Sequence, residues 1–169
     1  MDCILFRHGI AVEWSNWSGN DKDRSLTEEG TEKTFKGAKG LLNIGIKPTH
    51  ILCSPFHRTQ QTAEILKEVL NFPGSLQFCS ELFSEASPRE LFNLLETYPK
   101  KSCILCVGHE PHLGHTAAVM LCGQPLIGLS MKKAGACLIQ FHCLPRPGEG
   151  TLQWWLAPSQ LRHLGSSSI

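Results

Sequence analysis

The chain alternates short apolar runs with longer stretches in which apolar residues recur every three or four positions. The runs predict strands at 3–6, 51–53, 76–78, 102–107, 136–141 and 152–156. The helical spacing predicts helices between an N-cap at Thr27 and a stop at Gly45, and over 63–70, 88–98 and 112–121. Because continuous apolar strands need cover on both faces, the pattern predicts an α/β three-layer sandwich with a mostly parallel central sheet flanked by helices.

The length of 169 residues suits one domain, and no repeat or linker divides it. We expect a domain over 1–165 and a flexible Ser-rich tail over 166–169. No insertion is large enough to form a lid. The polar segment 11–26 predicts a long loop, and such loops are often functional. Its Trp14 and Trp17 are more typical of core or loop anchors than of substrate platforms, although a role in partner docking stays open.

Composition narrows the classes of function. Apolar residues make up 41% and charged residues 18%, and the formal net charge is +1, so bulk electrostatics favour neither nucleic acid nor membrane as a partner. No apolar run could span a bilayer, and the N-terminus lacks the pattern of a secretory signal. The dispersed cysteines indicate no disulfide framework, and Cys103 and Cys106 should point to opposite faces of one strand. We therefore expect a cytoplasmic protein, a monomer by default, with no metal and no cofactor.

Basic residues follow three of the predicted strands. Arg7-His8-Gly9 follows the first, a segment containing Arg58 follows the second, and Gly108-His109 follows the fourth. If these strands are parallel neighbours, the groups meet at one edge of the sheet. Two guanidiniums and two imidazoles brought together there require an anion, and arginine forks match the oxygens of a phosphoryl group.

The sequence excludes several common ways of handling phosphate. It has neither a Walker-type Gly-x-x-x-x-Gly-Lys loop nor a Gly-x-Gly-x-x-Gly motif. Cys53 and Arg58 are one residue too close for a Cys-x₅-Arg loop. A neutral histidine can instead attack phosphorus and form a covalent intermediate.

Four segments together resemble the histidine phosphatase superfamily, and its SixA-type branch in particular. They are Arg7-His8-Gly9, Leu26-Thr27-Glu28-Glu29-Gly30 with the preceding Arg24, Ser54-Pro55-x-x-Arg58-Thr59-x-Gln61-Thr62-Ala63, and Gly108-His109. The resemblance implies that His8 is the nucleophile. It also implies that Arg7, Arg58 and His109 bind the phosphoryl oxygens, with Arg24 adding a contact as in SixA-like relatives.

The general acid is a separate question. Larger members of the superfamily use a glutamate shortly after the third strand. Glu81 is the candidate at that place, and Glu85 is the alternative.

The missing lid and the partly matched acid segment are typical of SixA-like proteins, which act on phosphohistidine in proteins. Imidazole is also a far better leaving group than an alcohol, since the pKa of its conjugate acid is about 6.5. We therefore expect a metal-independent phosphatase that removes phosphate from phosphohistidine in a protein partner and releases inorganic phosphate. The alternatives are a small-molecule phosphomonoesterase on the same scaffold and a non-catalytic module that binds phosphate or a phosphoprotein, although a binder would not need His8.

Overall fold

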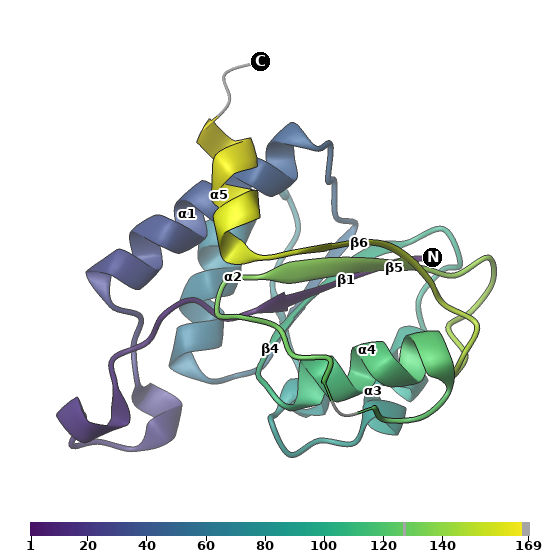
Figure 1. The fold of residues 1–169 in the computed structure, drawn as a ribbon, viewed down its shortest axis with the longest axis horizontal. Coiled ribbons are helices and arrows are strands. Elements are labelled where there is room, and N and C mark those ends of the chain that lie inside the picture. Colours follow the sequence, from purple (N-terminus) through teal and green to yellow (C-terminus); the bar gives the residue numbers. More distant parts are fainter. Residues whose placement is uncertain (127, 167–169) are drawn as a thin grey trace.

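A computed structural model describes residues 1–126 and 128–166 (Figure 1). In this part of the chain, six strands form one sheet in the order β3-β2-β4-β1-β5-β6. Their bounds are Asp2–Arg7 (β1), His50–Cys53 (β2), Gln77–Phe78 (β3), Cys103–Gly108 (β4), Ala136–Gln140 (β5) and Thr151–Leu156 (β6). The first four in chain order pair in parallel, and β5 and β6 continue the sheet antiparallel. The predicted mostly parallel sheet is confirmed.

Helices cover both faces of the sheet, as the apolar strands require. Their bounds are Glu28–Asn43 (α1), His57–Val69 (α2), Pro88–Leu95 (α3), His112–Cys122 (α4) and Pro158–Ser166 (α5). Buried residues of α1, α2 and α5 form one hydrophobic cluster with the sheet, and those of α3 and α4 form the other. In Figure 1, α3 and α4 lie together on one side of the sheet, and α1 and α5 lie on the other. The three layers are therefore as predicted.

The register of the parallel strands positions the site. β4 lies between β1 and β2, with Arg7 opposite Gly108 and Cys53 opposite Val107. The chain segments that follow these three strands therefore begin side by side at one edge of the sheet. The three strands are therefore parallel neighbours, which is the arrangement that was expected to bring the basic residues together.

The C-terminal end differs from the expectation. Ser166 was assigned to a flexible tail, but it is the last residue of α5, and its hydroxyl donates a hydrogen bond to the Arg162 carbonyl at 2.9 Å. The rest of the expected tail, 167–169, lies outside the described residues. The helix was not predicted because it is only nine residues long and Leu161 is its buried residue, so packing on α1 holds it in place.

The first loop, residues 11–26, is closed by a bridge between Ala11 and Leu26. Trp14 is 59% exposed, so it is not the core anchor considered above. Trp17 does anchor the loop, because its indole Nε1 donates a hydrogen bond to the Asn20 carbonyl at 2.9 Å.

All eight cysteines are free thiols. Cys106 packs in the cluster beneath α3 and α4, whereas Cys103 borders the opposite cluster, as expected for residues three apart on a strand. Among the helices described, none has the length and apolar character needed to cross a membrane.

Candidate active site

Two buried histidines lie together at the edge of the sheet. His8 follows β1 and His109 follows β4, and their ring centroids are 5.1 Å apart. The backbone joins the two segments, because the His8 amide donates a hydrogen bond to the Gly108 carbonyl at 3.1 Å. His8 is 6% exposed and His109 is 2% exposed. The structure thus brings together two of the predicted site residues.

The ring of His8 is oriented and kept neutral. Its Nδ1 is 2.7 Å from the Gly9 carbonyl. Because a carbonyl can only accept, Nδ1 carries the proton and Nε2 keeps its lone pair. Burial lowers the pKa of His8 to about 3, which outweighs the hydrogen bond to Gly9, and the charges of Arg58 and Arg7 act in the same direction as burial. The neutral ring that results is the nucleophilic form.

Gly9 is required at its position. A Cβ on Gly9 would lie 2.3 Å from the Thr34 hydroxyl, well inside contact distance. The Gly9 amide donates to the Thr62 hydroxyl at 3.0 Å, and this hydroxyl donates to the Arg58 carbonyl at 2.7 Å. Thr62 therefore ties the segment that carries His8 to the first turn of α2, which carries Arg58.

Arg7 and Arg58 each keep a donor available for an anion. Arg58 is buried, its Cζ lies 4.8 Å from the centroid of the Phe56 ring, and its charge acts on both His8 and His109. Arg7 is half-buried and donates through Nη1 to the Met131 carbonyl at 2.7 Å. Within the described residues, the buried Nε of each guanidinium has no hydrogen-bond partner. Buried donors of this kind are costly unless a ligand accepts from them.

His109 contacts a hydroxyl that sequence reasoning left without a role. Its Nε2 is 2.9 Å from the Ser54 hydroxyl, and its ring packs edge-on against Phe56, with centroids 5.0 Å apart. Burial lowers the pKa of His109 to about 2, and the charge of Arg58 acts in the same direction. His109 is therefore neutral, and a phosphoryl anion bound beside it would raise its pKa.

Asp21, which the sequence analysis missed, joins Arg24 to Arg58. It lies in a short 3-10 turn (η2, Asp21–Asp23) of the first loop, where its Oδ1 accepts from Arg24 Nε at 2.9 Å. Its Oδ2 accepts from Arg58 Nη2 at 3.0 Å. Burial raises the pKa of Asp21, but the hydrogen bonds and charges of both arginines outweigh it and hold the pKa below its usual value. The only sequence signal was the three-residue spacing to Arg24.

The two candidate acids follow β3 and line one pocket. Glu81, on a 3-10 turn (η3, Ser80–Leu82), accepts a hydrogen bond from the Ser80 hydroxyl at 3.4 Å. Glu85 lines the same small pocket as Glu81, together with Phe83. The Phe83 ring is 5.4 Å from that of Phe56, which in turn contacts His109. The acid role of Glu81 therefore stays a prediction.

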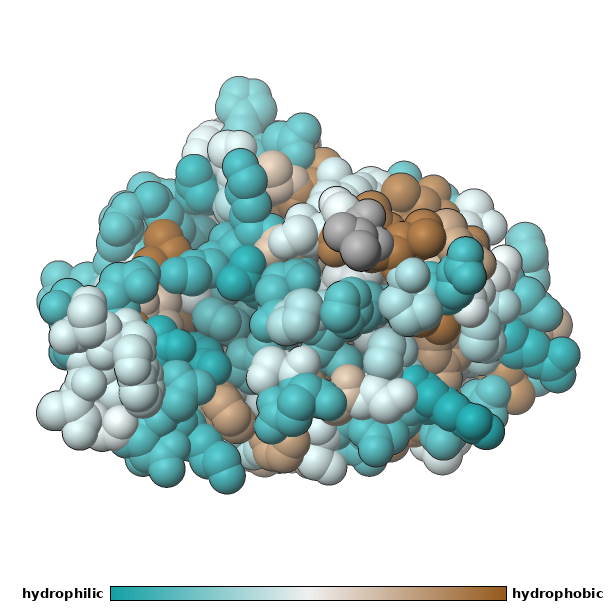
Figure 2. Space-filling view, turned by 60° about the horizontal axis from the view of Figure 1, so that its bottom comes forward, coloured by the Kyte–Doolittle hydropathy of each residue, from teal (hydrophilic) through white to brown (hydrophobic). Residues whose placement is uncertain are grey.

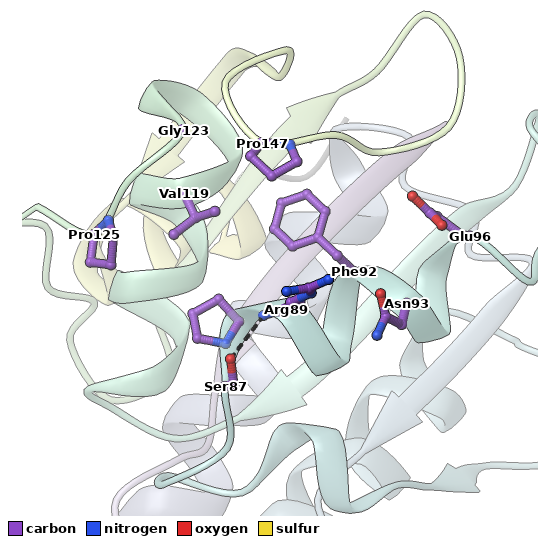
Figure 3. A pocket seen from close by; sticks show the side chains of 10 residues that line it. Ser87, Arg89, Phe92, Asn93, Glu96, Val119, Gly123, Pro125 and Pro147 are labelled. Atoms are coloured by element: carbon purple, nitrogen blue, oxygen red, sulfur yellow. Dashed lines mark hydrogen bonds between the residues drawn. The ribbon is translucent and has the colours of Figure 1, made fainter.

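A different groove lies between α3 and α4 (Figure 3). Phe92, Val119 and Pro147 form its apolar floor and walls, with Arg89 and Glu96 at its margins. Val119 is in the C-terminal half of α4, at the far end of this helix from His109. Among the residues described, no group of three or more His, Cys, Asp or Glu side chains is arranged to hold a metal ion.

The fold and the cluster of histidines and arginines agree with the comparison with known proteins. A family model for the histidine phosphatase superfamily (branch 1) matches residues 3–82. An uncharacterized protein of Picosynechococcus is 34% identical over 142 residues, which cover 80% of this chain and 82% of that protein. The chain belongs to the histidine phosphatase superfamily.

Within the superfamily, the chain is similar to SixA proteins over nearly its whole length. The phosphohistidine phosphatase SixA of Escherichia coli is 26% identical, over 96% of this chain and 97% of that protein. The structure of the protein histidine phosphatase SixA complexed with tungstate superposes with a TM-score of 0.78 at 25% identity, covering 95% of this chain and 99% of that one. The predicted SixA-type resemblance is confirmed.

Proposed function

We propose that this protein is a phosphatase that hydrolyses phosphohistidine on a protein partner, through a phosphohistidine intermediate on His8. The observation that carries the proposal is the neutral, oriented ring of His8, 5.1 Å from the ring of His109 and within the electrostatic influence of Arg7 and Arg58. A site that only bound phosphate would not need a ring held with Nε2 unprotonated. Similarity to the E. coli phosphohistidine phosphatase SixA supports the same substrate class.

The reaction has two steps. In the first, the lone pair on Nε2 of His8 attacks phosphorus, the bond between phosphorus and the substrate nitrogen breaks, and the departing imidazole keeps that electron pair and takes up a proton. In the second, water attacks the phosphorylated His8, which yields inorganic phosphate and regenerates the ring. Arg7, Arg58 and His109 stabilise the negative charge on the three non-bridging oxygens in both steps. Because fixed side chains supply this stabilisation, we propose that the reaction requires no metal.

Phosphohistidine suits this site better than an alkyl phosphate does. Alkoxide is a poor leaving group without a strong general acid, whereas imidazole leaves readily because the pKa of its conjugate acid is about 6.5. The carboxylate whose charge acts on His109 is Asp21, whose lowered pKa keeps it ionised. A site with this arrangement favours a substrate that needs little acid assistance.

The test compares two substrates with a chelator present. The purified protein is incubated with a phosphohistidine-bearing protein domain and separately with an aryl phosphate, with His8→Ala as the control. We expect rapid loss of phosphohistidine, slower aryl phosphate turnover, and no turnover of either by the variant. Acid-labile, alkali-stable phosphate on the wild-type protein would identify the intermediate. Turnover of the aryl phosphate alone would instead indicate a small-molecule phosphomonoesterase, and no His8-dependent turnover would favour a binding module.

A further inference from the structure

A strongly basic pocket lies directly beside the candidate active site. Its volume is about 420 Å³, within the range of ligand-binding pockets. Five of its eight lining residues are cationic and none is acidic; the five are Arg7, Lys33, Lys132, Lys133 and Arg162. We call this the basic pocket. The chain's net charge of +1 gave no sign of such a concentration.

Tertiary structure assembles the basic pocket from four separate parts of the chain. Arg7 ends β1, Lys33 is on α1, Arg162 is on α5, and the two adjacent lysines are on the turn before β5. This turn is fixed to the nucleophile segment, because the Ala134 amide lies 3.1 Å from the carbonyls of both Arg7 and His8. Ala134 has a φ of +60°, a left-handed backbone conformation that is unfavourable for a residue with a side chain. The turn therefore holds its lysines in a defined place.

The basic pocket is continuous with the phosphoryl site. Arg7 belongs to both, and the charge of Lys133 acts on His8. Two of the five cations form ion pairs, since Lys133 pairs with Glu13 at 3.3 Å and Lys33 pairs with Glu29. The charge of Glu110 also acts on Arg7. Lys132 and Arg162 form no ion pair within the part of the chain that the structure describes. Their charges are therefore available to a ligand held next to His8.

We propose that the basic pocket binds acidic side chains next to the phosphohistidine of the protein substrate. This inference rests on the proposed function, because it assigns the surroundings of the same reacting group. The cations come from four elements around a cavity that adjoins the phosphoryl site, so they suit several carboxylates spread along a partner's surface. Figure 2 shows a mostly hydrophilic surface with small hydrophobic spots over the left part of this view, and a larger hydrophobic area toward its upper right. Carboxylates facing these cations would steer the partner so that its phosphohistidine meets His8.

The test uses two synthetic peptides, each with one phosphohistidine, flanked by glutamates in one and by glutamines at the same positions in the other. We expect wild-type kcat/KM to be about tenfold higher for the glutamate peptide, and this ratio to fall toward one in 0.5 M salt, which screens the charges. In the double variant Lys132→Glu/Arg162→Glu, the ratio should fall to one or below. The exposed Lys132→Glu single variant should lower the ratio in the same direction if the double variant does not fold.

The matched control is Lys101→Glu. It makes the same change in charge just before β4, at the opposite edge of the sheet from the site, so it should keep the wild-type ratio. Equal kcat/KM for the two peptides in wild type, at low salt, would overturn the inference while leaving the proposed function intact. The pocket would instead bind a small molecule if wild type hydrolysed both peptides equally and preferred a small phosphate ester with a second anionic group over one without it. That preference would have to be lost in Lys132→Glu. Failure of wild type to hydrolyse either peptide would overturn both proposals.

Discussion

Arg58 donates two hydrogen bonds to Asp21, one to its backbone carbonyl at 2.8 Å and one to its carboxylate at 3.0 Å. The carboxylate also pairs with Arg24, so one acidic group of the first loop engages two arginines that the resemblance assigns to phosphate binding. An anion that enters the site must share these donors with Asp21 or displace its side chain. The first loop is therefore coupled to the charge of the site.

This coupling predicts the effect of Asp21→Asn on phosphate binding. The substitution removes a negative charge next to the bound anion and leaves the hydrogen bond from Arg58 to the backbone of residue 21. We expect the inhibition constant of inorganic phosphate to fall by about threefold to tenfold, as the loss of one nearby like charge allows. The control is Asp23→Asn, the same change on an exposed residue of the same turn. Unchanged or weaker phosphate inhibition in Asp21→Asn would contradict the prediction.

Arg58 should not be replaceable by lysine. A lysine keeps the charge but loses the planar fork that can bind Asp21 and a phosphoryl oxygen together. We expect Arg58→Lys to lower kcat/KM by about 10² to 10³, as the loss of a transition-state donor does in other enzymes. Tungstate binding, measured by calorimetry, should weaken in parallel. Arg89→Lys, in the groove of Figure 3, serves as the control and should retain wild-type values.

The role of Glu81 can be tested with two substrates whose leaving groups differ in their need for a general acid. If Glu81 is the general acid, Glu81→Gln should lower hydrolysis of an alkyl phosphate by about tenfold or more, because general acids typically contribute 10² to 10⁴. Hydrolysis of a phosphohistidine peptide should change less than about threefold, since imidazole needs little assistance. The same pair of assays on Glu85→Gln tests the alternative. If alkyl phosphate hydrolysis responds to neither substitution, both carboxylates are excluded as the acid.

The buried histidines predict that acid destabilises the fold. Burial lowers the pKa of His8 to about 3 and that of His109 to about 2, while an unfolded histidine titrates near 6.5. Below pH 6.5 the unfolded chain binds more protons than the folded chain, so stability falls as the pH falls. At pH 5 each of these histidines should lower the free energy of unfolding by about 1–2 kcal/mol.

Chemical denaturation between pH 5 and 8.5 measures this loss. The free energy of unfolding should decline from pH 7 to pH 5, and the decline should be smaller by about 1–2 kcal/mol in His109→Gln than in wild type. Between pH 7 and 8.5 the histidine contribution should be constant, which provides an internal control. Equal slopes for the two proteins below pH 6.5 would mean that His109 titrates normally in the folded state.

Alanine substitutions at two glycines of α1 should have opposite effects on the free energy of unfolding. A Cβ on Gly40 would lie 2.1 Å from the Leu161 carbonyl of α5, whereas a Cβ on Gly37 would find its nearest neighbour at an ordinary 3.8 Å. We expect Gly40→Ala to lower the free energy of unfolding by about 1–3 kcal/mol or more through overpacking. Gly37→Ala should raise it by up to about 1 kcal/mol, because alanine favours helix. Thermal unfolding of both variants checks the prediction, and a stable Gly40→Ala would contradict the close approach of α1 and α5.

Much of the fold was accessible from the sequence because the central strands β1, β2 and β4 are largely buried and consist mostly of unbroken apolar runs. The helix α5 was not, because it is short and its stability depends on the contact of Leu161 with α1 at Gly40. The exposure of Trp14 could not be predicted either, because a tryptophan can lie in a core or at a loop tip and residue type alone does not distinguish the two.

For the site, the sequence by itself determined which basic residues are present: Arg7 at the end of β1, His8 just after it, Arg58 at the start of α2 and His109 after β4. Parallel pairing of β1, β4 and β2 then had to bring them together. Only the tertiary structure decided the rest, namely Asp21 between two arginines, Ser54 beside His109 and the cations of the basic pocket. These groups come from segments distant in sequence, and their contacts depend on loop paths and helix packing that no local pattern records. Charge and hydrogen bonding act through space, so the roles of these groups follow from where folding places them.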